Sequence, residues 1–100
     1  MKSGYRIDWS EEALNNIDSI VDYLMVNWSD REIGNFYKKI DKRLNTILKN
    51  PLAYPSSHLK TNTRRCVLSE QTTIYYEIKI DSIVILSLLD NRKEPGSLKI

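Results

Sequence analysis

Two runs of apolar residues at helical spacing, joined by a very short connection, most constrain what this 100-residue chain can fold into. The first run follows Ser10, and its apolar side chains recur every three or four residues: Ala13, Leu14, Ile17, Ile20, Val21, Leu24 and Trp28. This spacing places them on one face of an α-helix. Ser10, followed by Glu11 and Glu12, predicts the helix start, because a hydroxyl and two carboxylates stabilise the positive end of a helix dipole.

The second run predicts another amphipathic helix. Ser29 and Glu32 have the spacing of a capping box, and the apolar positions that follow are Ile33, Phe36, Tyr37, Ile40, Leu44, Ile47 and Leu48. Asn50-Pro51 predicts the end of this helix, because proline disfavours helical geometry in the residue before it. Only a few residues separate the two helices, so we expect them to form an antiparallel hairpin.

Strand patterns flank the two helices. Residues 5–9 alternate apolar and polar side chains, and residues 73–80 place Ile74, Tyr76, Ile78 and Ile80 on one face. Residues 65–69 predict a further strand, after a loop over residues 50–62. Residues 83–89 are apolar on both faces, which predicts a central strand. We expect the first strand to pair with this central strand, in a direction that the sequence leaves open.

The expected fold is therefore α+β, in the order β-α-α-β-β-β. The last three strands are joined by short turns and should form an antiparallel meander. The helix hairpin should pack on one face of this small, mainly antiparallel sheet, because neither apolar stripe is stable in water. A chain of this length accommodates one domain, over residues 1–100, with an irregular C-terminal tail over residues 90–100.

Composition argues against several classes of protein. With one cysteine, Cys66, and one histidine, His58, the chain can form neither an internal disulfide nor a closed zinc site, and we expect no metal and no cofactor. The N-terminus carries charges where a signal peptide needs an apolar core. The longest apolar run, residues 83–89, is too short to span a bilayer as a helix. We therefore expect a cytoplasmic protein without a membrane partner.

Positive charge is concentrated in the middle of the chain. The formal net charge is only +2, yet residues 33–65 hold eight basic side chains and one acidic one. The basic residues are Lys38, Lys39, Lys42, Arg43, Lys49, Lys60, Arg64 and Arg65. This block favours an acidic partner, either a nucleic acid or a protein segment. A solvent-facing, lysine-rich helix surface would give the same pattern.

Two basic clusters are candidate binding sites. Arg64 and Arg65 open a strand, where neighbouring side chains point to opposite faces, so one of them should reach the face away from the helices. Residues 90–95, which include Asn91, Arg92 and Lys93, follow directly on the apolar strand. Each cluster is equally compatible with an ordinary charged surface.

Other single residues are weaker candidates. His58 and Lys60 form a possible proton-transfer pair in the loop, although an exposed loop histidine explains the same residues. Tyr75 and Tyr76 lie on opposite faces of one strand, so one of them should be in the core. Cys66 is expected to be a small buried apolar residue.

The ordered set of local patterns resembles the RelE/ParE superfamily of type II toxin–antitoxin toxins, and within it the ParE-like plasmid-stabilisation group. The matching segments are residues 7–13, 27–29, 50–51, 63–65, 74–76 and 88–95. One departure is Asn62-Thr63, where members often carry a glycine before the arginine pair.

The resemblance implies a bacterial toxin held in a hetero-oligomer by a cognate antitoxin, and it leaves two activities open. ParE-like members bind and poison DNA gyrase, whereas RelE-like members cleave ribosome-bound mRNA. Lys60, Arg65 and Arg92 match parts of the RelE-like catalytic set, but the tyrosine expected after the C-terminal arginine has no counterpart. The low net charge also gives only a weak attraction to RNA.

We therefore expect a gyrase-binding inhibitor rather than an enzyme, with a ribosome-dependent endoribonuclease as the alternative. A decayed toxin that binds only its antitoxin is a third reading. The residues expected to contact the target are Arg64, Arg65, Asn91, Arg92 and Lys93. The residues expected to contact the antitoxin are Lys38, Lys42, Arg43 and Lys49.

Overall fold

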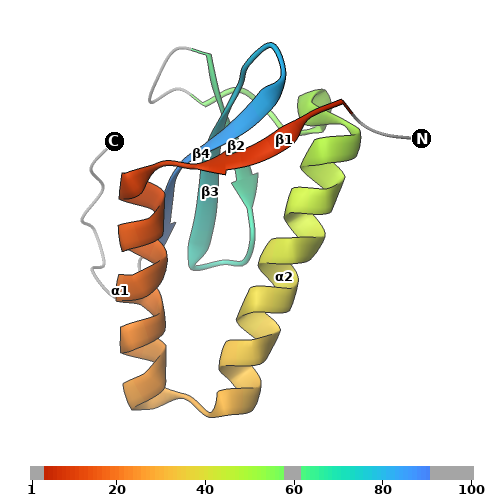
Figure 1. The fold of residues 1–100 in the computed structure, drawn as a ribbon. Coiled ribbons are helices and arrows are strands. Elements are labelled where there is room, and N and C mark those ends of the chain that lie inside the picture. The colour runs from red at the N-terminus through yellow and green to blue at the C-terminus, as the bar shows by residue number, and fades with distance from the viewer. Residues whose placement is uncertain (1–3, 58–61, 91–100) are drawn as a thin grey trace.

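The computed structural model describes residues 4–57 and 62–90 of the chain. Its elements, in order, are β1 (Arg6–Trp9), α1 (Glu11–Asn27), α2 (Asp30–Lys49), the 3-10 turn η1 (Pro51–Ala53), β2 (Thr63–Val67), β3 (Thr72–Ile78) and β4 (Ser82–Asp90) (Figure 1). This order confirms the expected α+β succession. Among the described residues, neither helix is long and apolar enough to cross a membrane.

The four strands form one sheet in the order β1-β4-β3-β2. Strands β2, β3 and β4 make the expected antiparallel meander. Strand β1 pairs with β4 in parallel, from Arg6 beside Ser82 to Trp9 beside Ile85. The central position of β4 confirms the interpretation of its two apolar faces, and the structure settles the direction of β1.

Both helices begin where their capping residues predict, and α2 also ends where predicted. The Ser10 hydroxyl accepts a hydrogen bond from the Ala13 amide at 3.0 Å. Ser29 and Glu32 form a complete capping box, with both reciprocal hydrogen bonds present. Helix α2 ends before Pro51, with the Asn50 amide donating to the Thr46 carbonyl.

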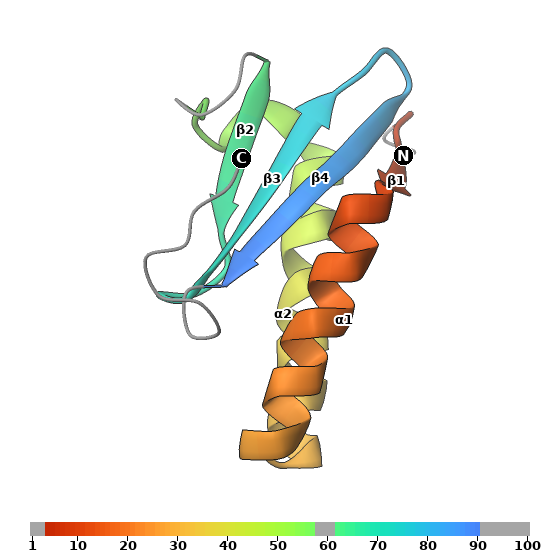
Figure 2. The same ribbon diagram turned by 90° about the vertical axis from the view of Figure 1, so that its left-hand side faces the viewer.

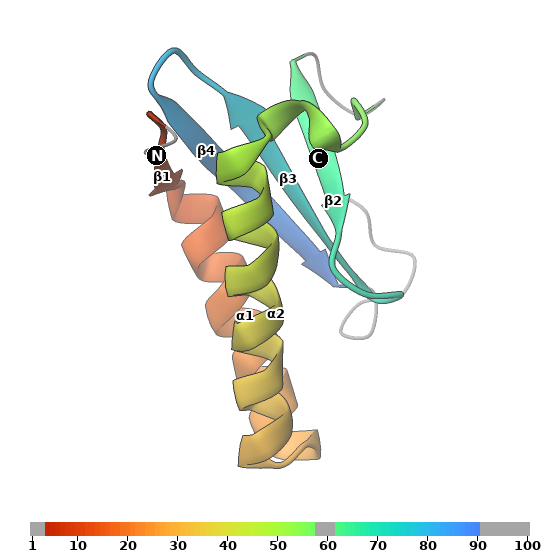
Figure 3. The ribbon, with the colours of Figure 1, turned by 90° about the vertical axis from the view of Figure 1, so that its right-hand side faces the viewer.

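The hairpin covers one face of the sheet, and the core lies between them (Figure 3). The strands contribute Cys66, Ile74, Tyr76, Ile83, Ile85 and Leu88, and the helices contribute Ala13, Ile20, Leu24, Phe36, Ile40, Leu44 and Ile47. We call the opposite side of the sheet the outer face. Tyr75 lies on this outer face and is nonetheless buried, so both tyrosines of the pair are covered.

Helix α1 is fixed to β4 at an irregularity in the sheet. Tyr75 pairs with Ser87 but Tyr76 pairs with Ile85, so Leu86 is an extra residue in β4. The Ser10 hydroxyl donates to the Leu86 carbonyl at 2.8 Å. The Asn16 side-chain oxygen accepts from the Leu88 amide at 2.9 Å. Two side chains of the α1 region therefore satisfy the β4 backbone where β1 no longer pairs with it.

Several sequence-based expectations were wrong in detail. Ile80 is 97% exposed because β3 ends at Ile78 and the chain turns back, with the Lys79 amide donating to the Ser82 carbonyl. Strand β2 begins at Thr63 rather than Arg65, because Thr63 and Arg64 already pair with Glu77 and Tyr76 of β3.

The apolar stripes are also less completely buried than expected. Leu14, Trp28 and Tyr37 are between 40% and 50% exposed. Figure 2 shows that the connected end of the hairpin extends well beyond the sheet, which accounts for the exposure of Trp28 between the two helices.

Candidate functional site

The two adjacent arginines of β2 have different environments. Arg64 lies on the helix side of the sheet, beside Tyr76, and its Nη1 donates to the Tyr54 carbonyl at 2.6 Å. Arg65 lies on the outer face and is exposed. Arg65 forms no salt bridge with any residue that the structure describes. Of the pair, Arg65 is therefore the side chain available to another molecule.

A group of partly polar side chains holds η1 and the following residues against the sheet. The Tyr76 hydroxyl donates to the Pro51 carbonyl at 2.7 Å, and burial raises the pKa of Tyr76 to about 12. Burial also raises the pKa of the Cys66 thiol and of Tyr54, which share a hydrogen bond. These groups keep their protons at neutral pH, so they anchor the segment and are not poised as bases or nucleophiles.

A small recess lies at the outer edge of β2. Its volume is about 330 Å³, and its lining residues are Arg43, Tyr54, Pro55, Arg65 and Val67. Arg43 reaches across from α2, and its Nε donates to the Val67 carbonyl at 3.4 Å. Two guanidinium groups from distant parts of the sequence therefore meet in one hollow.

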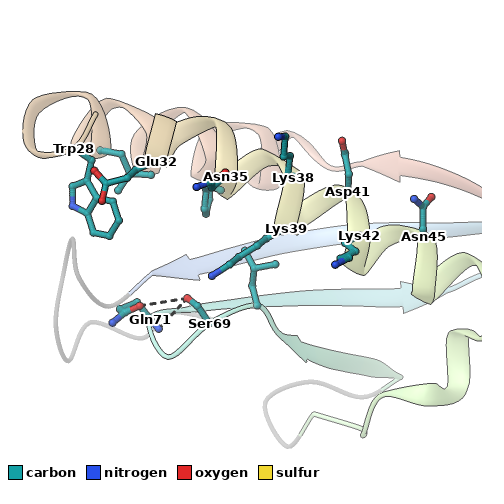
Figure 4. Close-up of a pocket in the computed structure, with 13 residues that line it drawn as sticks. Trp28, Glu32, Asn35, Lys38, Lys39, Asp41, Lys42, Asn45, Ser69 and Gln71 are labelled. Carbon is teal, nitrogen blue, oxygen red and sulfur yellow. Dashed lines mark hydrogen bonds between the residues drawn. The ribbon is translucent and has the colours of Figure 1, made fainter. Parts of the chain in front are cut away.

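A larger groove of about 760 Å³ lies between α2 and the β2–β3 turn. Leu24, Phe36 and Leu68 give it an apolar floor, and Trp28 stands at the hairpin end. Figure 4 shows Lys39 extending from α2 toward Ser69 and Gln71 across the groove. Its dimensions and its mixture of apolar and charged lining are typical of a binding cleft.

The structure separates the predicted antitoxin-binding residues into three places. Lys38 and Lys42 line the larger groove, whereas Arg43 lines the recess. Lys49 is exposed in the last turn of α2 and lines neither hollow. Sequence reasoning left Lys39 and the apolar floor out of the predicted site. Leu24 and Phe36 belong to the apolar stripes of the two helices. Because the same pattern marks core residues, it does not single them out as residues of the groove.

The remaining predicted site residues lie outside the described part of the chain; they are His58, Lys60, Asn91, Arg92 and Lys93. Within residues 4–57 and 62–90, no three His, Cys, Asp or Glu side chains are grouped so that they could hold a metal ion.

Comparison with known proteins connects this architecture to one family. Residues 7–95 match the model of a family described as the ParE toxin of type II toxin–antitoxin systems, parDE. No curated protein matches the sequence significantly.

Solved structures share the fold at low sequence identity. A chain of the chromosomal ParDE system from P. aeruginosa superposes with a TM-score of 0.74 at 14% identity, covering 88% of this chain and 97% of that one. A chain of the E. coli DinJ–YafQ toxin–antitoxin complex has a TM-score of 0.65 at 9% identity, covering 93% and 99%. The YoeB dimer from Staphylococcus aureus gives a TM-score of 0.58 at 21% identity, covering 85% and 94%. At these identities the superpositions establish the fold alone.

Proposed function

This chain belongs to the ParE toxin family of type II toxin–antitoxin systems, and we propose that it arrests growth by binding DNA gyrase until a cognate antitoxin neutralises it. Arg65 carries the target-binding part of this proposal. Its guanidinium is exposed on a rigid strand, faces away from the helices and has no described carboxylate partner. A planar, multiply donating cation at such a position suits recognition of another macromolecule.

The proposal narrows the predicted set of target-binding residues. We propose that Arg65 contacts the target together with Asn91, Arg92 and Lys93. Arg64 would act indirectly, because its hydrogen bond to the Tyr54 carbonyl holds the segment beside β2.

Two features favour protein binding over RNA cleavage. Lys93-Glu94-Pro95 follows Arg92, where the RelE-like pattern leads to a tyrosine, so a general acid or base of that set has no counterpart. Near Arg64, burial raises the pKa values of Cys66 and Tyr76. Neither residue therefore takes the place of the missing tyrosine as a general acid or base. The alternative function is an endoribonuclease with Lys60, Arg65 and Arg92 as its catalytic residues. The expression experiment described below distinguishes it from gyrase poisoning.

We propose that the antitoxin occupies the larger groove with an acidic, amphipathic segment. Its apolar side would pack on Leu24 and Phe36, and its carboxylates would face Lys38 and Lys42. Toxin–antitoxin assemblies among the structural neighbours support an antitoxin as the partner. Opposite charges on the two proteins would speed their encounter. We place the complex in the cytoplasm, where gyrase acts on the chromosome.

Inducible expression without an antitoxin tests the proposal. We expect growth arrest with filamentation and chromosomal DNA breaks, without phased cuts in translated mRNA. An Arg65→Gln variant should be less toxic, and Lys49→Gln, which removes the same charge elsewhere, should retain toxicity. Codon-phased mRNA cleavage with intact DNA would show that the chain is a ribonuclease and not a gyrase poison. Harmless expression of soluble protein would indicate a decayed toxin.

A further inference from the structure

The recess at the outer edge of β2 holds two cations that the described fold does not neutralise. Its lining residues are Arg43, Tyr54, Pro55, Arg65 and Val67, and no acidic side chain is among them. Neither arginine forms a salt bridge with a residue in the ranges 4–57 and 62–90. Arg65 is exposed and Arg43 is half-buried. The recess is therefore a positively charged hollow that is open to an anion.

The two guanidinium groups reach the recess from different elements. Arg65 extends from the outer face of β2, whereas Arg43 comes from α2 and is held at the strand by the hydrogen bond from its Nε to the Val67 carbonyl, at 3.4 Å. The two oxygens of a carboxylate lie in one plane, so a single guanidinium fork satisfies them. The two unesterified oxygens of a phosphodiester diverge from a tetrahedral phosphorus. A phosphodiester can therefore accept hydrogen bonds from two guanidinium groups on different sides at once.

The rest of the recess is apolar and belongs beside a phosphate only if that phosphate carries organic substituents. Tyr54 and Pro55 lie next to the arginines, and Val67 completes the lining. Pro55 and Val67 are exposed, and Tyr54 is half-buried. Nucleic-acid sites commonly combine cations for the backbone with aromatic and apolar surfaces for the sugar and base. This combination favours a nucleotide unit over an acidic peptide.

We propose that the recess binds a backbone phosphate of DNA, with Arg43 and Arg65 on the phosphate and its sugar against Tyr54 and Pro55. The source of this DNA rests on the proposed function, because it would be the segment that gyrase cleaves. A chain that contacts both gyrase and the broken DNA favours the cleaved state, since a ligand shifts an equilibrium toward the state that it binds better. The formal net charge of +2 gives only a weak attraction to free DNA, so the contact depends on gyrase presenting it.

Two oligonucleotides that differ in backbone charge test the recess in the absence of gyrase. The first is a tetramer of deoxyuridylate with ordinary phosphodiester linkages, and the second is the same tetramer with uncharged methylphosphonate linkages. Each is titrated at low salt into the ¹⁵N-labelled full-length chain and followed by NMR. We expect the charged tetramer to bind about tenfold more tightly, because each guanidinium then has an anionic acceptor. Its shifts should centre on the Nε–H groups of Arg43 and Arg65.

Substitutions provide a second readout. The Arg43→Gln and Arg65→Gln variants should each lose most of the preference for the charged tetramer. Arg31→Gln, which removes an exposed arginine from the first turn of α2, should keep it. Unchanged thermal unfolding would show that the variants are folded, and the comparison of the two tetramers on the unmodified chain requires no substitution.

The gyrase reaction connects the recess to the proposed function. On supercoiled plasmid, Arg43→Gln should require a severalfold higher concentration than the unmodified chain to trap cleaved DNA. Its binding to gyrase without DNA should be unchanged, because the lost contact is to the DNA. The Arg31→Gln variant again serves as the matched control and should behave as the unmodified chain in both measurements.

Several outcomes would overturn the inference. Equal affinity for the two tetramers, or shifts that avoid the recess, would show that it is not a phosphate site. Tighter binding of tetraglutamate would assign it to an acidic protein, and tighter binding of tetrauridylate would assign it to RNA. A chain that poisons gyrase equally well with Arg43→Gln would refute this inference and leave the proposed function standing. Binding of the charged tetramer without any trapped DNA would refute the proposed function and leave the phosphate site.

Discussion

At the scale of single residues, the arginine pair shows how identical neighbours acquire different roles. The alternation of a strand predicts that Arg64 and Arg65 point to opposite faces. It does not predict which one is free, because that depends on a carbonyl at Tyr54, ten positions earlier in the sequence. The loop conformation that brings this carbonyl to Arg64 is set by contacts of η1 with the sheet, which local patterns do not encode.

The first prediction compares the two arginines by urea unfolding. Arg64→Gln should lower the free energy of unfolding by about 1.5–3 kcal/mol, because a charged donor to a part-buried carbonyl is lost. Arg65→Gln should change it by less than about 0.5 kcal/mol, since its side chain is exposed. Equal losses in the two variants would contradict the structural role given to the Arg64 hydrogen bond.

The second prediction concerns alkaline pH. Burial raises the pKa of Tyr76 from 10.0 to about 12. Between these values the unfolded chain releases the proton and the folded chain retains it, so raising the pH favours unfolding. The stability contributed by this group should be intact below pH 10 and lost as the pH approaches 12. Denaturant unfolding across this range should give a shallower decline for Tyr76→Phe than for the unmodified chain, and identical declines would contradict the role given to Tyr76.

At the scale of elements, the sequence predicted the helix starts best, because the residues that determine them lie close together in the chain. Ser10 and the Ser29–Glu32 capping box marked both helix starts, because a cap acts through residues within one turn. The ends of strands were less predictable. Ile80 continues the alternation of β3, but the turn that pairs Lys79 with Ser82 removes it from the sheet. Periodicity alone does not indicate where a turn interrupts it.

The third prediction tests the attachment of α1 to β4. Asn16→Ala removes the acceptor of the Leu88 amide and should cost about 1–3 kcal/mol of unfolding free energy, because that part-buried donor loses its partner. Asn15→Ala, an exposed neighbour on the same helix, should change stability by less than about 0.5 kcal/mol. Hydrogen exchange at the Leu88 amide should accelerate in the first variant only. Unchanged exchange there would refute this anchoring role.

At the scale of the whole molecule, the candidate sites arise from segments that the fold brings together. Arg43 and Arg65 lie 22 positions apart in the sequence, and they meet only because α2 crosses beside the edge of β2. The groove above Leu24, Phe36 and Leu68 exists because the hairpin extends beyond the sheet (Figure 2). The sequence predicted the basic character of this region and its α+β frame. It could not predict which basic residues share a hollow, because that depends on how the helices pack on the strands.

The fourth prediction concerns gyrase poisoning itself and is checked by titrating purified gyrase with the purified chain. On supercoiled plasmid, the unmodified chain should trap cleaved DNA in proportion to its concentration, and Arg65→Gln should require a severalfold higher concentration, since a planar cation on the contact face is lost. The Lys49→Gln variant serves as the matched charge control. The absence of trapped cleaved DNA at excess chain, in a reaction where a known gyrase poison works, would contradict gyrase poisoning by this chain.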